Sequence, residues 1–480
     1  MAQEEKSIIR VLTAPTIELD EFSVADQFTG TNESGSTSPN QMQKQAGNYY
    51  PLIKINNYIF DDQELIKMRL YNTDFLPTIS LQVRLLKSTI FLAKAFPKDG
   101  DIVSVYIRGR NDIYKPIRND YVINSVSTSN SIDQTGSGMV INISGELSIP
   151  GMNYEVFSVI NNTSYEALAT IAEELGLGFA SNETHTEDSQ KWLATGMTHK
   201  SFIQHITEHS WKDGDSHFIT YVDIYYNLNF VNLGNQFSES GIIEDGLLDD
   251  FVMNDDMDGQ TIPMGMGKKL FTNHVDFNNS NMYVKRWNPI NNSSNISKKW
   301  GYKMYSNFYE HETGEVWKIY SEPIMREGAG SDTILLRGRA GDNSHRENIK
   351  YKWQGIQYSD NVHDKYKFSK VHNNMNNIEL EKLKMSIEIR RANFNIYRSE
   401  RIPCILFDDN GDVYKLAVSR TEEEIEEGNL PKSQGMVIDR FYTGFYIISG
   451  MVFKYDKFKG DEERYMSEDV ILTRKEWPIP

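Results

Sequence analysis

The stretch that decides the fold is ISLQVRL, residues 79–85, in which apolar and polar side chains alternate strictly. Because successive side chains of a strand point to opposite faces, this period of two predicts a β-strand with one buried and one solvated face. Further apolar runs, separated by Gly, Asn and Asp, lie at 52–59, 102–107, 121–123 and 139–143. Short strands at this spacing predict a small barrel or sandwich, which we place at residues 48–150.

A second strand-rich region closes the sequence, at residues 381–480. Its apolar runs lie at 385–389, 405–407, 444–448, 451–453 and 470–472. The Asn-Gly of the turn 408–411 is typical of a hairpin. After residues 102 and 402 the same parts follow in the same order: a strand, a charged turn and two further strands. Two interpretations stay open, a divergent duplication and two unrelated β domains.

Helical signals lie between these two regions. Thr163 and Glu166 form a capping box, apolar residues then recur every three or four positions, and Gly176 is placed to end the helix. A second helix begins near Thr198 and leads into a long strand at 218–231. We therefore predict a helix–strand region at 151–235, followed by an insertion or peripheral domain at 236–380.

Polar segments indicate the remaining boundaries. Residues 29–48 are almost free of apolar side chains and cannot bury enough surface to offset their ordering entropy. We expect the N-terminal extension, 1–47, to be partly flexible. A polar break at 373–377 leads into a short predicted helix at 378–383.

The composition limits the classes of fold and function that the chain can have. A chain of 480 residues predicts two to four domains, and 26 Tyr and 23 Phe favour strands over helices. The net charge of −17 argues against binding to a nucleic-acid backbone, because such binding depends on Lys and Arg neutralising phosphates. The same charge suits a protein past which DNA moves without sticking.

The lone cysteine, Cys404, lies in an apolar run and is predicted to be a buried strand residue. It can form no intrachain disulfide and no cysteine zinc cage. The N-terminus lacks the apolar core of a signal peptide, and no apolar run reaches the ~18 residues of a membrane span. We expect a soluble protein that matures in a reducing compartment and has no membrane partner.

One motif suggests catalysis. His205, Glu208 and His209 spell H-x-x-E-H, the zinc-binding core of the inverted zincin proteases. On a helical wheel at roughly 100° per residue, His209 falls on the border of the apolar stripe, His205 beyond it and Glu208 nearly opposite. Three interpretations follow: a catalytic zinc site, a weak adventitious metal site, or the solvated edge of a surface helix. The wheel favours the solvated edge.

Other apparent motifs lack residues that their binding or catalytic sites require. Residues 254–259 resemble the start of a calcium loop, but its twelfth position is Gly265, where a bidentate glutamate is needed. The glycines at 328–330 and 338–341 form no phosphate loop, and no G-x-S-x-G elbow occurs. We predict no catalytic, cofactor-binding or metal-binding residue, no cofactor, and no enzymatic activity.

One part of the sequence resembles a known family. The segments 165–177 and 221–231, with Trp192 and Phe202-Ile203 between them, look like the central hub proteins of contractile phage tail baseplates. These hubs are related to the N-terminal part of type VI secretion spike proteins. The run 444–450 and the close at 472–478 are similar to the end of the family's second barrel. The resemblance covers residues 48–480 loosely, as a pattern of elements.

The resemblance implies a β-rich α+β fold with two tube-type small β-barrels, at 48–150 and 381–480, and a helix-containing region between them. Strands from 216–250 can add to the second barrel. Such hubs are homotrimers that form a pseudo-sixfold ring, so a threefold spike can dock under a sixfold tube. The extension 1–47 and the stretch 236–380 depart from the compact form of the family, and the second could pack against wedge proteins.

The implied partners are the chain itself, the central spike protein, tail tube or tube-initiator proteins, baseplate wedge proteins and, in the lumen, a tape measure protein. DNA only passes through, and an acidic lumen would let it slide. The implied location is the virion tail baseplate, assembled in the host cytoplasm. The alternatives are a zinc-dependent peptidase or wall hydrolase using His205, Glu208 and His209, and a tail tube initiator ring protein.

Overall fold

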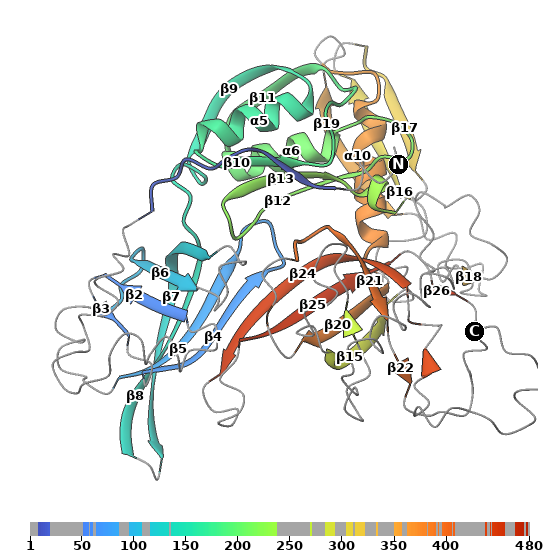
Figure 1. Ribbon diagram of the computed structural model, residues 1–480. Helices are drawn as coiled ribbons and strands as arrows, with labels where there is room; N and C mark the ends of the chain where they lie inside the picture. Colours follow the sequence, from blue (N-terminus) through green and yellow to red (C-terminus); the bar gives the residue numbers. More distant parts are fainter. Residues whose placement is uncertain are drawn as a thin grey trace, which may run out of the picture.

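The computed structural model describes the chain in segments, which are coloured in Figure 1. They are 8–19, 51–56, 58–60, 64–85, 96–107, 116–133, 136–237, 269–270, 284–292, 304–310, 313–321, 333–334, 350–357, 362–381, 383–389, 392, 396–405, 407–408, 437–438, 442, 444–456, 466–474 and 477–478. Strands dominate them, as the sequence predicts. No helix among them is long and apolar enough to cross a membrane.

The N-terminal half of the main sheet is built around the stretch 79–85. Its antiparallel strands lie in the order β4-β5-β8-β7-β6-β2, and the short β3 pairs with β2 at the end. They are β2 (Pro51–Ile55), β3 (Tyr58–Ile59), β4 (Leu65–Asn72), β5 (Thr78–Leu85), β6 (Ile102–Ile107), β7 (Ile117–Asp133) and β8 (Gly136–Leu147). Ile79, Leu81 and Val83 are fully buried, so the alternation in β5 turns one face to the core. We name these strands the first unit.

The C-terminal half repeats this topology. Its antiparallel strands lie in the order β15-β20-β25-β24-β21-β14. They are β14 (Lys269–Leu270), β15 (Val284–Asn291), β20 (Leu383–Ile389), β21 (Arg401–Ile405), β24 (Gly444–Asp456) and β25 (Ser467–Thr473). The order of the strands along the chain matches too. The equivalent pairs are β2 and β14, β4 and β15, β5 and β20, β6 and β21, β7 and β24, and β8 and β25. We name these strands the second unit.

Irregularities in the two units also coincide. The pairing of β4 with β5 shifts register after Leu65, and the pairing of β15 with β20 shifts at the equivalent residue, Val284. The pairing of β7 with β8 shifts between Ile123 and Ser125, and that of β24 with β25 between Ile448 and Gly450. Bulges are positional features of a strand pair, so their coincidence favours the divergent duplication over two unrelated domains.

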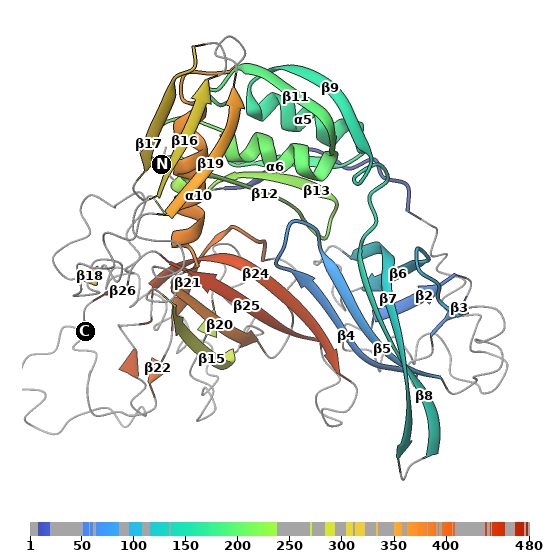
Figure 2. The same cartoon turned by 180° about the vertical axis from the view of Figure 1, so that it is seen from behind.

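The two units join edge to edge into one 13-stranded sheet through antiparallel pairing of β24 with β4. Figures 1 and 2 show β15 and the β7–β8 hairpin toward opposite ends of this sheet. No pairing among the described strands closes either unit on itself. The runs 444–448 and 451–453, separate in the sequence prediction, form the single strand β24 with a bulge between them.

A helical cap lies beside the sheet. Helices α5 (Ser164–Glu174) and α6 (His199–His209) lie between the two-stranded antiparallel sheet of β9 (Glu155–Asn162) with β11 (Gln190–Thr198) and the sheet β1-β10-β13-β12 (Figure 1). That sheet holds β1 (Arg10–Thr13), β10 (Gly178–Ser181), β12 (Phe218–Val222) and β13 (Asn227–Asn232), and α7 (Leu233–Gln236) follows it. The predicted long strand 218–231 is wrong, because a tight turn at 223–226 folds it into the hairpin β12–β13.

The predicted start of the first helix is confirmed. The Thr163 side chain accepts a hydrogen bond from the Glu166 backbone N–H, and its own hydroxyl lies 3.2 Å from the Glu166 carboxylate. Gly176 follows the helix with a positive φ of 68°, the left-handed conformation that glycine adopts without strain. Part of the N-terminal extension is ordered, since β1 pairs with β10, whereas the polar link 29–48 lies outside the described residues.

A peripheral layer covers α6 on its other side. A sheet in the order β17-β16-β19 packs with α10 (Tyr366–Glu379), and α10 contacts α6. Its strands are β16 (Met304–Glu310), β17 (Val316–Ser321) and β19 (Lys350–Gln357). The predicted break at 373–377 is wrong, because these residues lie inside α10, where Asn373 and Asn376 are buried and hydrogen-bonded. Two short pairs complete the fold, β18 (Thr333–Ile334) with β26 (Trp477–Pro478) and β22 (Phe407–Asp408) with β23 (Val437–Ile438).

Candidate functional site

The junction between the two units is the first candidate for a functional surface. Six residue pairs align β24 with β4, from Met451 opposite Asn72 to Asp456 opposite Lys67. On the core side, Phe453 lies opposite Leu70, and both side chains are fully buried. An antiparallel ladder with an apolar face of this kind makes the two units one continuous body.

The cap fastens this junction from one end. The Tyr221 hydroxyl donates a hydrogen bond of 2.5 Å to the backbone oxygen of Arg398, whose guanidinium lies 4.5 Å from the Tyr221 ring centroid. Arg398 also donates to the backbone oxygen of Asp74, in the turn between β4 and β5. Burial raises the pKa of Tyr221, so the phenol stays protonated. Tyr221 and Arg398 thus tie the cap to both units at once.

The turn between β12 and β13 fastens the cap to the first unit. Buried Asp223 accepts four hydrogen bonds of 2.8–3.1 Å, from the backbone N–H of Tyr225 and of Asn227 and from the side chains of Asn227 and Asn229. Tyr226 adopts a positive φ of 61° there, and its hydroxyl accepts from the Asp120 backbone N–H of β7. Burial raises the pKa of Asp223, and its hydrogen bonds oppose that rise.

The H-x-x-E-H motif lies on α6, but its histidines are not at a solvated edge as predicted. His209 is 1% exposed, because α10 packs over this face of α6. The His209 ring stacks on Tyr366 with centroids 3.6 Å apart, and its Nδ1 donates to the Tyr366 backbone oxygen at 3.0 Å. His205 Nε2 lies 3.4 Å from the Tyr366 hydroxyl. The helical wheel missed this contact because it considers one helix and no neighbour.

The electrostatics of these residues are those of neutral packing groups. Burial lowers the pKa of His205 to about 4 and that of His209 well below its usual range, with Lys370 adding to both effects. Glu208 forms an ion pair with Lys370 at 2.7 Å. A zincin needs this glutamate to activate water and a third ligand besides the two histidines. Within the described part of the chain, no three His, Cys, Asp or Glu side chains form a group that could hold a metal.

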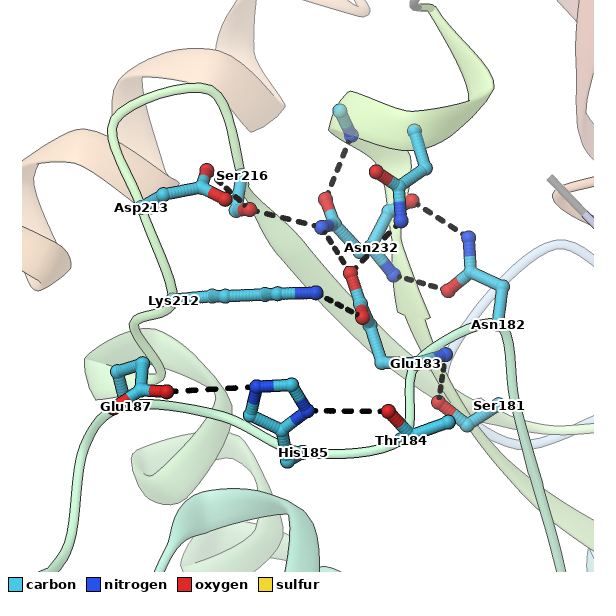
Figure 3. A network of polar contacts seen from close by, with 12 residues as sticks. Ser181, Asn182, Glu183, Thr184, His185, Glu187, Lys212, Asp213, Ser216 and Asn232 are labelled. Carbon is cyan, nitrogen blue, oxygen red and sulfur yellow. Dashed lines mark hydrogen bonds and ion pairs between the residues drawn. The ribbon is translucent and has the colours of Figure 1, made fainter. Parts of the chain in front are cut away.

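A polar network beside the cap helices links three segments of the cap (Figure 3). The buried carboxylate of Glu183 accepts from the side chains of Asn232 at 2.7 Å and Asn235 at 2.8 Å, and pairs with Lys212 at 2.5 Å. The amide of Asn182 exchanges two hydrogen bonds with the Asn232 backbone. Through Glu183 the network joins the segment 182–183 to Lys212 and to residues 232–235.

The remaining residues and motifs that the sequence analysis considered are either buried or outside the described residues. Cys404 is buried in β21 as predicted, and burial raises the pKa of its thiol. The calcium-like residues 254–259, Gly265 and the glycines at 328–330 and 338–341 lie outside the described residues. An apolar patch on the β9–β11 sheet was not predicted; it consists of exposed Tyr154, Phe157, Val159 and Leu193.

The sequence analysis also missed the junction residues, because the observation that points to them appears only in the strand pairing. β24 and β7 are the long strands of their units, and each runs past the end of the strand on one of its sides. β21 pairs only with residues 444–447 of β24, and β6 only with residues 117–122 of β7. Unused length on one edge of a strand indicates a second partner along that edge.

Comparisons with known proteins return likenesses of structure alone. No family model and no curated protein matches the sequence. The chain is similar to the tail protein of Neisseria meningitidis MC58, at 8% identity over 89% of this chain and 97% of that one, with a TM-score of 0.44. It is also similar to the 43 kDa tail protein of prophage MuSo2 from Shewanella oneidensis, at 11% identity over 90% and 99% of the two chains and the same TM-score of 0.44.

A third similar structure is the half-lidded PdpA–VgrG complex of Francisella, at 10% identity over 91% of this chain and 61% of that chain, with a TM-score of 0.36. The solved structures that this chain is similar to thus include two tail proteins, one of them from a prophage, and a PdpA–VgrG complex.

Proposed function

We propose that this chain is the structural hub of a contractile phage tail baseplate, a homotrimer that adapts a sixfold tail tube to a threefold central spike. Each unit of the sheet then corresponds to one tube-type small barrel. The chain's role is mechanical: it matches two symmetries and surrounds the channel through which DNA passes.

The observation that supports this proposal is the repeated topology within one chain. Two units with the same strand order, chain order and bulge positions are joined edge to edge by β24 and β4. Three such chains arranged around an axis present six similar units, which three copies of a single-unit chain could not do. The duplication therefore supplies a quasi-sixfold face on a threefold molecule.

The sheet face turned away from the core is the one we assign to the channel. On it, Lys67, Arg69 and Lys454 lie on the neighbouring strands β4 and β24, Asp469 of the next strand forms an ion pair with Lys454, and Glu388 lies opposite Asp469. We infer that the lining carries both signs of charge, in place of the acidic lining expected from the net charge of the whole chain. Mixed charge still suits DNA that passes without binding, because an acidic neighbour such as Asp469 neutralises Lys454 and weakens its attraction for phosphates.

The proposed partners are the central spike below, tail tube or tube-initiator proteins above, and wedge proteins at the periphery. A tape measure protein would occupy the lumen before DNA does. The location that follows is the tail baseplate of the virion. Peptidase activity has no support from the motif, because Glu208 is paired with Lys370 and His209 Nδ1 is used by Tyr366.

Light scattering on the purified full chain, followed by particle imaging, tests the proposal. We expect a mass of three chains and images with six similar lobes around a channel. A hexamer would instead favour the tube-initiator alternative, since six two-unit chains give twelve lobes. Stoichiometric zinc that is lost on His205→Ala would contradict a purely structural role.

A further inference from the structure

The contact between α10 and the C-terminal end of α6 is built from polar groups (Figures 1 and 2). The last four carbonyl groups of a helix have no partner inside the helix. Here Asn373 donates to three backbone oxygens of the segment 207–210. Ser369 and His363 bind the fourth, that of His209, at 2.9 and 3.0 Å. The start of α10 and the residues just before it therefore cap α6.

The peripheral layer also has a small apolar cluster of its own. Phe308 of β16 packs with Val371 and Met375 of α10, and Ile319 and Ile378 lie against them. This cluster is separate from the one that joins the cap helices to the main sheet. An element that keeps its own apolar cluster and is held to its neighbour by polar contacts can open locally, because opening exposes little apolar surface.

Four histidines lie in this contact, and three of them have a defined protonated nitrogen. His209, His363 and His372 each place one ring nitrogen 3.0 Å from a backbone oxygen across the contact. A carbonyl oxygen only accepts, so this nitrogen carries the hydrogen and the other nitrogen is left to take a second proton. In His363 that second nitrogen is Nδ1, which is buried without a hydrogen-bond partner among the described residues. The fourth ring, His205, lies 4.9 Å from that of His209 between centroids.

The surroundings of the rings disfavour added positive charge. Burial lowers the pKa of His205 to about 4 and also lowers the pKa values of His209 and His363. β11 faces the rings with neutral side chains, those of Gln190 and Trp192. The charged groups that act on the rings come from the other elements around them: Lys370 of α10, Glu208 of α6, Asp364 just before α10, and Asp188 between β10 and β11.

The acidic groups among these neighbours are already engaged. Glu208 pairs with Lys370 at 2.7 Å. Asp188 accepts hydrogen bonds from the backbone N–H groups of Ser164 and Trp211. Protonated rings would therefore gain little compensation while α10 stays in place, and they regain water when it leaves.

Protonation thus favours the open contact. With α10 in place the rings exclude a proton that they bind at their ordinary pKa of 6.5 once exposed. The contact is therefore most stable above pH 6.5 and weakens as the pH falls. His205 alone, with a pKa of about 4 closed and 6.5 open, raises the opening constant about thirtyfold between pH 7.5 and pH 5.

We propose that α10 is an acid-released latch on the cap, which leaves the end of α6 as the pH falls from 7.5 to 5 while the main sheet stays folded. Leu380, at the end of α10, packs with Tyr221 of the cap, so the released helix stays tethered. Release uncovers the backbone oxygens of 207–210 and the Trp211 ring, which packs on Phe368. The inference goes beyond the proposed hub function and does not depend on it.

Hydrogen exchange of the full native chain at pH 7.5 and pH 5.0, corrected for intrinsic exchange rates and read by mass spectrometry, tests the latch. We expect the opening constant of the α10 amides to rise at least about thirtyfold at pH 5.0. The opening constants of the β5 and β24 amides should change by less than about threefold. Return to pH 7.5 should restore the protection of α10.

Variants identify the groups that titrate. His205→Gln should reduce the acid response of α10 about thirtyfold. His363→Gln keeps an amide donor for the His209 backbone oxygen and removes the titrating ring, so it should reduce the response as well. The matched control is His185→Gln, whose side chain is 60% exposed outside the contact, and it should respond as the native chain does.

Three results would overturn the latch. One is an equal rise for α10 and for the main sheet, which is acid unfolding of the whole chain. Another is an opening constant of α10 that changes less than about threefold. The third is a full acid response in the double variant of His205→Gln with His363→Gln. A native chain that is monomeric or hexameric and still shows the α10 response would contradict the proposed hub and retain the latch.

Discussion

The two units differ in what covers their long strands. β24 of the second unit is covered along its distal half by β4, and the facing side chains on the core side are buried and, apart from Asn72, mostly apolar. β7 of the first unit carries Val126 and Thr128 at equivalent positions and meets no described strand along that edge. The same topology therefore serves as permanent core in one place and as a polar, pairing-competent edge in the other. A permanent junction can be apolar, whereas an edge that is exposed before assembly must stay soluble.

The largest effect is expected from truncating the permanent junction. Phe453→Ala removes a fully buried ring opposite Leu70 and should lower the free energy of unfolding by about 4 kcal/mol. Urea denaturation followed by tryptophan fluorescence measures this loss. The matched variant at the equivalent open position, Thr128→Ala, should change the same quantity by less than about 0.5 kcal/mol. Similar losses in both variants would break the comparison between the two units.

The next largest effect concerns the turn that holds the cap on the first unit. Asp223→Ala leaves four buried N–H groups without their acceptor and should cost about 3 kcal/mol. Hydrogen exchange should show the cap opening at lower free energy than the main sheet. Asn229→Ala, which removes one donor and keeps the carboxylate, should cost about 1 kcal/mol. Equal exchange from cap and sheet would contradict this.

A smaller effect on the free energy of unfolding depends on pH and arises from His205 in the cap. The folded pKa of His205 is about 4 and the unfolded value is 6.5, so the unfolded chain binds a proton that the folded chain excludes. This stability is present above pH 6.5 and is lost as the pH falls, by about 2 kcal/mol at pH 5. Urea midpoints measured across this range should fall less steeply in His205→Gln. An unchanged slope would place the titrating group elsewhere.

The smallest effect on stability should accompany a large effect on assembly. Thr128→Lys places a charge at the exposed edge of β7 and should change the free energy of unfolding of the dissociated chain by less than about 0.5 kcal/mol. Where the proposed homotrimer covers this edge, the lysine would lose its solvation, so light scattering should show dissociation at concentrations where the native chain assembles. A trimer of undiminished stability would leave the β7 edge without this role.

Much of the fold follows from local patterns. The alternation at 79–85 and the capping box at Thr163 and Glu166 each specify one element, and both are present where the sequence places them. The candidate site could be predicted from the sequence only to a smaller extent. The sequence at 223–226 does not distinguish a turn from a continuing strand, and only the structure shows that the Asp223 carboxylate accepts four hydrogen bonds there. The sequence around His209 likewise gives no indication of α10, which begins 157 residues later.

The sequence by itself determined the β-rich class, the helices of the middle region, the buried cysteine and the parallel order of parts at the two ends. These depend on side-chain period and on contacts within a few residues, which a sequence displays directly. Only the tertiary structure decided that the units share one sheet, that the H-x-x-E-H histidines pack against α10, and that the distal half of β7 pairs with no second strand among the described residues. Each of these depends on contacts between residues far apart in the chain, and such contacts exist only after folding has brought the partners together.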